Sequence, residues 1–232
     1  MSAKQLAQLG TDLWKTRTDK VAAETFTLTY GALVVQLLRD YEDYQQVNTQ
    51  LERMGYNIGT RLIEDFLARS GLPRCTDFAT VGQVVAKVGF KMFLNVSPAV
   101  NTVINPTATT SSTTGDGGTS SASSMGAQPQ SNAGAAAGGT TASTTSSQTI
   151  QEFALTLDEN PLAEFVELPP DARAKGLWFS NVLCGVIRGA LEMVQMQTEA
   201  YFVSDTLRGD DTTEIRVRLI RTLDEEGPIA DD

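Results

Sequence analysis

The sequence contains no histidine and only two cysteines, Cys75 and Cys184. Without an imidazole, neither a Ser-His-Asp nor a Cys-His nucleophile can be assembled, and the commonest metal ligand is missing. Two cysteines are also too few for a structural zinc centre. The composition therefore excludes most familiar hydrolases and metalloenzymes, and we expect neither catalytic residues nor a metal site.

Positive charge is scarce as well, since the formal net charge is −10. Nucleic-acid binding draws most of its affinity from basic surface, so we expect no nucleic-acid partner. The most apolar long window, residues 178–196, is interrupted by Arg188 and Glu192 at helical spacing, which favours a buried helix over a membrane span. With no signal sequence visible, we expect a cytoplasmic protein whose attachment to any membrane is peripheral.

Residues 107–149 consist almost wholly of Thr, Ser, Ala, Gly and Gln. Such a segment cannot bury enough apolar surface to offset the entropy of ordering, which predicts a disordered insert. We therefore divide the chain into a flexible extension (1–25), a single domain (26–224) interrupted by this insert, and an acidic tail (225–232). For the mildly basic first twenty residues, a short membrane-surface helix is the alternative to a frayed end.

Helical spacing of apolar residues predicts helices over 28–40, 47–66 and 81–92, the last ending near Asn95. The first two are joined by few residues, so we expect them to pack antiparallel. A longer helix is predicted from Phe179 to Phe202. Alternation of apolar and polar residues at 153–157 and 215–219, and a short apolar run at 165–168, predict strands. The fold class is α+β, with antiparallel helices packed on a small, mostly antiparallel sheet.

Several predicted helices contain glycine, which costs about 1 kcal/mol relative to alanine in a helix interior. These glycines suggest that another helix or a slender ligand packs closely against the backbone. Two of the pairs have the spacing that lets helices approach one another. The pairs are Gly55 and Gly59, Gly82 and Gly89, and Gly185 and Gly189.

Cys75 lies between the second and third predicted helices, directly after Arg74. If Thr76 or Asp77 is the N-cap of the third helix, unpaired backbone N–H groups and the guanidinium favour the thiolate. Cys75 is then the most reactive group of the chain, with a packed, inert thiol as the alternative. We expect Cys184, surrounded by apolar residues in the sequence, to be buried and inert.

Six segments together resemble the Bet-three family of subunits of the transport protein particle, TRAPP. They are FTLTYGAL (26–33), GYNIGTRLIEDFLAR (55–69), RCTDF (74–78), NPLAEFVEL (160–168), SNVLCGVIRGALEMV (180–194) and TEIRVR (213–218). The resemblance covers roughly residues 26–100 and 153–224. It departs from the family at the first 25 residues and at the insert.

This resemblance implies a single α+β domain that forms heterodimers with related TRAPP subunits. It implies a non-catalytic core scaffold of a vesicle-tethering complex, peripheral at ER-Golgi and Golgi membranes. That complex acts in ER-to-Golgi transport as a nucleotide exchange factor for a Rab-type GTPase. The C-terminal segment of the family reaches the GTPase, and here the matching contact residues are Asp224, Glu225 and Glu226.

The resemblance also implies a long acyl chain, such as palmitate, thioester-linked at Cys75 inside a narrow apolar channel in the helical layer. Our hypothesis is that Gly82, Val85 and Gly89, which follow Cys75 on one predicted helix, line that channel. The resemblance does not settle whether the chain is instead an autonomous fatty-acyl binding or carrier protein. A third possibility, self-acylation at Cys75, lacks a histidine to act as base at pH 7.

A scaffold and a carrier differ in their need for a partner. A scaffold should bury an exposed apolar helical face in a heterodimer, and we expect Leu33, Leu37 and Leu51 to lie in that face. A carrier should exchange its acyl group as a monomer.

Overall fold

A computed structural model describes residues 1–75, 77–105 and 150–223. The predicted insert at 107–149, Thr76 and the predicted tail at 225–232 lie outside these residues. The helices are α1 (Ala3–Thr16), α2 (Ala23–Asp40), α3 (Tyr44–Ser70), α4 (Phe78–Val84), α5 (Phe90–Leu94), α6 (Pro170–Ala174) and α7 (Val182–Met193), with a π-helical segment η1 (Val85–Gly89) and a 3-10 turn η2 (Thr206–Arg208). The strands are β1 (Ala99–Asn105), β2 (Ile150–Leu157), β3 (Met196–Ser204) and β4 (Thr213–Thr222).

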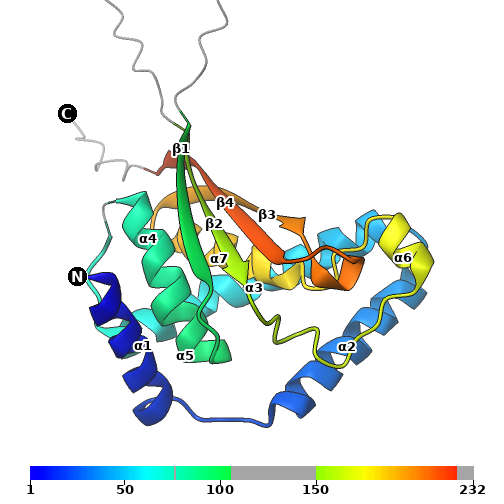
Figure 1. The fold of residues 1–232 in the computed structure, drawn as a ribbon, viewed down its shortest axis with the longest axis horizontal. Helices are drawn as coiled ribbons and strands as arrows, with labels where there is room; N and C mark the ends of the chain where they lie inside the picture. The colour runs from blue at the N-terminus through cyan, green and yellow to red at the C-terminus, as the bar shows by residue number, and fades with distance from the viewer. Residues whose placement is uncertain (76, 106–149, 224–232) are drawn as a thin grey trace, which may run out of the picture. The chain divides into compact units, whose positions relative to one another are not determined.

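The strands form one antiparallel sheet in the order β1-β2-β4-β3 (Figure 1). Its buried face consists of cross-strand rows, because residues two apart on a strand point to the same side. One row joins Phe153, Val217 and Ala200, and the next joins Leu155, Ile215 and Phe202. Helices α4 and α7 pack on this sheet, which confirms the predicted α+β class.

Helices α3 and α7 lie in backbone contact. A Cβ atom built on Gly55 would lie 2.0 Å from the carbonyl oxygen of Val182, and one on Gly185 would lie 2.0 Å from that of Glu52. Only glycine permits this distance. Of the two alternatives, another helix rather than a slender ligand packs against these glycines. Residue numbers rise together along the contact, which makes the two helices parallel. Likewise, a Cβ atom built on Gly59 would lie 2.2 Å from the Val186 carbonyl oxygen, and one on Gly189 would lie 2.4 Å from that of Tyr56.

The predicted packing of α2 along α3 is limited to a small contact. The glycine faces direct α3 onto α7 instead, and α2 also forms hydrogen bonds to residues that follow β2. The Thr27 hydroxyl donates to the Pro161 carbonyl (3.1 Å), and the Tyr30 hydroxyl donates to the carbonyl of Phe179. Leu51 is fully buried on α3, so its predicted place in an exposed face is wrong.

The first residues of the chain differ from the flexible extension that we expected. They form α1, which starts with a capping box between Ser2 and Gln5 and buries Leu6 and Leu13. These leucines pack in a cluster with residues of α3, α4, η1 and α5. Gly10 permits close contact with η1, since a Cβ there would lie 2.1 Å from the carbonyl oxygen of Lys87. Two buried leucines seven residues apart are too sparse a signal to predict this docking from sequence.

Two strand and helix assignments need correction. Residues 165–168 form no strand, because the Asn160 side chain and backbone hold the chain before them in a turn and Phe165 is exposed. The predicted helix from Phe179 to Phe202 ends at Met193, and Gln195 (φ 67°) turns the chain into β3. Pairing with β4 decides the strand, since every second residue from Met196 to Phe202 is buried. Strand β1 was not predicted at all.

The third predicted helix has the expected extent but is not uniform. It consists of α4, η1 and α5 in direct succession and ends at Asn95, which adopts the left-handed conformation. The π turn of η1 inserts an extra residue into the helical repeat, a feature that is frequent at functional sites.

Candidate functional site

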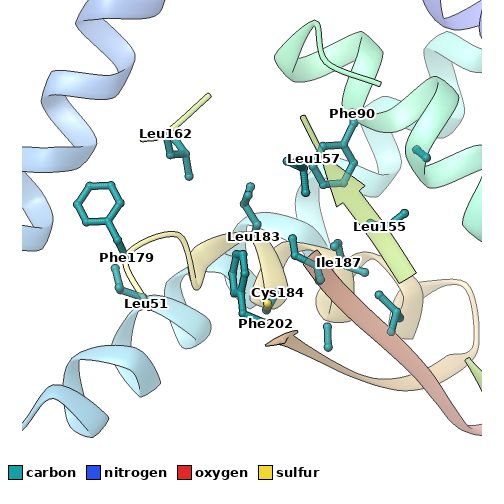
Figure 2. Close-up of a cluster of buried hydrophobic side chains, with 14 of the residues drawn as sticks. Leu51, Phe90, Leu155, Leu157, Leu162, Phe179, Leu183, Cys184, Ile187 and Phe202 are labelled. Carbon is teal, nitrogen blue, oxygen red and sulfur yellow. The ribbon is translucent and has the colours of Figure 1, made fainter. Parts of the chain in front are cut away.

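An apolar cavity of about 830 Å³ lies between the helices. Its walls come from α3 and α7 on one side and from α4, η1 and α5 on the other, while α2 and the turn after β2 close it further. Several residues of its wall belong to the main hydrophobic core, among them Phe90, Leu183 and Ile187 (Figure 2). A cavity of this size and polarity suits a small apolar ligand.

The cavity extends along α7. Residues from Val182 to Val194 line it, and the 12-residue helix is roughly 18 Å long at its normal rise. Cys75 and Arg74 follow the end of α3, which runs parallel to α7, while Tyr30 and Leu162 lie near the start of α7. The cavity therefore has a thiol at one end and an aromatic ring at the other.

Cys75 is half-buried and lines the cavity. Its pKa is raised above the ordinary value by burial and by the negative charge of Asp77, while the N-terminal ammonium acts in the opposite direction. Asp77 is the N-cap of α4 and accepts from the backbone N–H (2.9 Å) and the hydroxyl (3.0 Å) of Thr80. This direction is opposite to the lowering of the thiol pKa that we expected, because burial disfavours the thiolate and the carboxylate of Asp77 adds a negative charge nearby.

Of the three glycine and valine residues that we expected in an acyl channel, Val85 and Gly89 line this cavity and Gly82 does not. A Cβ atom at Gly82 would lie 2.9 Å from the Phe153 ring, so this glycine makes room for the sheet. At Gly89, a Cβ would meet no described atom closer than the Val84 carbonyl oxygen at 4.0 Å. The π turn brings Val84, Val85 and Gly89 to the same wall of the cavity.

The sequence also singled out Cys184 and three acidic residues, and the structure describes only the cysteine. Cys184 is buried, and burial raises its pKa, which agrees with an inert core thiol. Asp224, Glu225 and Glu226 lie outside the described residues. In the described part of the chain, no helix combines the length and hydropathy needed to cross a bilayer.

Sequence reasoning missed the closed end of the cavity. Tyr30, Leu162 and Val182 come from three segments that are distant in the chain, and each reads in the sequence as an ordinary core position. The only available signal was the presence of all three within segments that carry the family resemblance. Their convergence depends on how α2 and the turn after β2 pack against the start of α7.

The family model for transport protein particle (TRAPP) components matches residues 26–113 and 130–218. The chain is 50% identical over 226 residues to the transport protein particle subunit bet3 of Schizosaccharomyces pombe, covering 97% of this chain and 98% of that protein. It is 44% identical over 231 residues to the trafficking protein particle complex subunit BET3 of Saccharomyces cerevisiae, covering 99% and 97%.

A solved structure is also similar. It is the crystal structure of trafficking protein particle complex subunit 3 from Naegleria fowleri, covalently bound to palmitic acid. The two chains are 38% identical and align with a TM-score of 0.64 over 88% of this chain and 98% of the other.

Proposed function

Because this chain belongs to the transport protein particle (TRAPP) component family, we propose that it is a core scaffold subunit of the TRAPP vesicle-tethering complex and carries a long acyl chain on Cys75. In this role it serves ER-to-Golgi transport and supports nucleotide exchange on a Rab-type GTPase without catalysing a reaction itself. It works in the cytoplasm, peripherally at ER-Golgi and Golgi membranes.

The observation that carries the acylation proposal is the cavity with a thiol at one end. An extended polypeptide advances about 3.3–3.6 Å over three backbone bonds, so roughly 15 bonds of a similarly extended acyl chain fill a length of about 18 Å. That length matches the palmitic acid bound to the relative from Naegleria fowleri. Each buried methylene contributes about 0.8 kcal/mol, so a chain of this length gains a large free energy by entering the cavity.

The chemistry is an acyl transfer to the thiolate of Cys75. The sulfur attacks the thioester carbonyl of an acyl-coenzyme A, a new carbon–sulfur bond forms, and the bond to the coenzyme A sulfur breaks as its thiolate leaves and takes a proton from water. The raised pKa makes this step slow at neutral pH, because little thiolate is present. Once formed, the neutral thioester suits the half-buried position of the sulfur.

The partner of this subunit is a related TRAPP subunit. Support comes from α2, where Leu28 (61% exposed) and Val35 (47%) lie seven residues apart on one face and present apolar side chains to solvent, while Leu33 (38%) lies on a different face of the helix. Apolar surface of this kind marks protein contacts when it is contiguous. Leu37 is half-buried and packs inward against the main core, so it contributes less to such a face.

The acidic residues Asp224, Glu225 and Glu226 contact the GTPase in this proposal. Carboxylates near a bound nucleotide compete with its phosphates for magnesium and for basic groups. They would stabilise the nucleotide-free GTPase relative to the bound form, and exchange needs only this difference in affinity. Truncation after Leu223 should reduce exchange by the reconstituted complex, and unchanged exchange would refute this contact.

An autonomous acyl carrier remains the second candidate, because the described residues of this one chain supply the whole lining found for the cavity. The two functions differ in partner dependence. A carrier should exchange its acyl group with free donors as a monomer, whereas a scaffold should keep it through assembly.

The deciding experiment is the intact mass of the protein purified from its own cells, before and after neutral hydroxylamine. We expect an increment of one long acyl chain that hydroxylamine removes. It should be absent in Cys75→Ser and present in the matched control Cys184→Ser, whose sulfur lies in the core. An unmodified wild-type mass would overturn the acylation proposal.

A further inference from the structure

We infer that Tyr30 sets the length of acyl chain that the cavity accepts, by closing the end remote from Cys75. This inference rests on the proposed acylation and adds to it a residue that determines specificity. It follows from three observations: how Tyr30 is held, where it lies, and what borders it.

Tyr30 is held by contacts outside the cavity that its ring lines. Its hydroxyl donates to the carbonyl of Phe179, and its ring meets the Phe179 ring edge-on, with centroids 5.2 Å apart and planes at 84°. One turn earlier, Thr27 is buried and donates to Pro161. Burial of the hydroxyl raises the pKa of Tyr30, so it stays a donor at physiological pH. The ring is therefore fixed and cannot swing aside for a longer ligand.

The position of Tyr30 defines the usable length. Phe179 lies three residues before the start of α7, whereas Cys75 follows the end of α3, which runs parallel to α7, so the length of these helices separates the two groups. An acyl chain attached to Cys75 runs along α7 and meets the Tyr30 ring after roughly 15 bonds by the same length argument. Leu162 and Val182 lie beside the ring at this end.

The border of this end explains why longer chains are disfavoured. Phe26 and Ile58 also line the cavity, yet they are 45% and 48% exposed. A chain that is too long must turn at Tyr30 toward these two side chains, where additional methylenes stay partly in water. They lose much of the burial that each methylene otherwise contributes, about 0.8 kcal/mol. Affinity should therefore stop rising beyond the length at which the chain reaches Tyr30.

The test is a competition among saturated acyl-coenzyme A donors from lauroyl to arachidoyl, read as the mass distribution of acylated full-length protein. The wild type should favour palmitoyl. In Tyr30→Ala, loss of the ring opens space, and the preferred chain should lengthen by roughly two to four carbons. Tyr30→Phe keeps the ring and should keep the palmitoyl preference, although loss of the hydrogen bond should broaden the distribution.

Val182→Phe tests the same end in the opposite direction. It adds volume beside Tyr30 and should shift the preference toward myristoyl. Ile220→Ala changes an exposed side chain of β4 that is not part of the lining, and it should leave the distribution unchanged. Circular dichroism and a thermal melt establish that each variant is folded.

The outcomes separate the two proposals. If wild-type protein takes up no acyl group at Cys75 from any donor, the proposed acylation fails. If it is acylated but folded Tyr30→Ala shows the wild-type distribution, only the inference about Tyr30 is overturned. Should Tyr30→Ala not fold, an unshifted Val182→Phe distribution overturns it equally.

Discussion

The two walls of the cavity both contain glycine, for opposite physical reasons. In the wall of α3 and α7, Gly55 and Gly185 let two backbones touch, and any side chain there would collide with a carbonyl oxygen at 2.0 Å. In the wall of α4, η1 and α5, Gly89 faces the cavity and leaves volume unfilled. Glycine in the first wall lets two helices pack in contact, whereas glycine in the second wall leaves part of the cavity unfilled.

The largest expected effect on stability concerns the wall formed by α3 and α7. Gly55→Ala places a methyl group against the Val182 carbonyl, and since backbone must move to relieve this contact, we expect a loss of about 3 kcal/mol or more in the free energy of unfolding. Chemical denaturation measures it. The matched control is Gly89→Ala, where space is available and helix propensity predicts a change of at most about 1 kcal/mol, in the stabilising direction. Equal losses in both variants would contradict the difference between the walls.

We expect α1 to stabilise the wall formed by α4, η1 and α5. Leu6→Ala removes a buried side chain from the cluster that α1 forms with α3, α4, η1 and α5. We expect about 2–3 kcal/mol of destabilisation and earlier hydrogen exchange in residues 85–92 than in α3. Leu9→Ala, at a half-buried position of the same helix, should cost clearly less. If Leu6→Ala is neutral, α1 does not stabilise this wall.

Filling the second wall should block the ligand without unfolding the protein. Gly89→Leu extends a side chain into the cavity, so we expect loss of acylation at Cys75 with stability within about 1 kcal/mol of wild type. Intact mass and a thermal melt measure the two quantities. Gly89→Ala serves as the control, because one methyl group leaves most of the cavity open. Normal acylation of Gly89→Leu would place the acyl chain elsewhere.

The smallest expected effect is on the rate of acylation at the Cys75 thiol. Asp77 raises the pKa of Cys75, so Asp77→Asn should lower that pKa and accelerate acylation at neutral pH, while asparagine still caps α4. For the wild type, the rate should rise with pH until the thiol is deprotonated. We expect an acceleration of only a few-fold, because Asp77 is exposed and a less basic thiolate is also a weaker nucleophile. A slower variant would contradict the assigned role of this charge.

Local patterns predicted the parts of the fold in which side chains of one element decide its burial. Helical spacing identified α2, α3 and the α4 to α5 run, and strict alternation identified β2 and β4. The sequence also singled out Cys75 and the glycine pairs, because glycine within a helix has a cost that requires a reason. It could not tell that Gly82 faces Phe153 while Gly89 faces the cavity, because the π turn between them changes the helical face.

Only the tertiary structure decided the rest. Residues 196–202 became a strand because β4 offers its unpaired edge, and α1 docked because Gly10 fits against η1. The pKa of Cys75 is raised because the fold buries the thiol and because the helix cap supplies a carboxylate. The closed end of the cavity formed from three distant segments. In each case the deciding free energy comes from contacts between residues far apart in the chain, whereas the sequence by itself determines the contacts within single helices and strands.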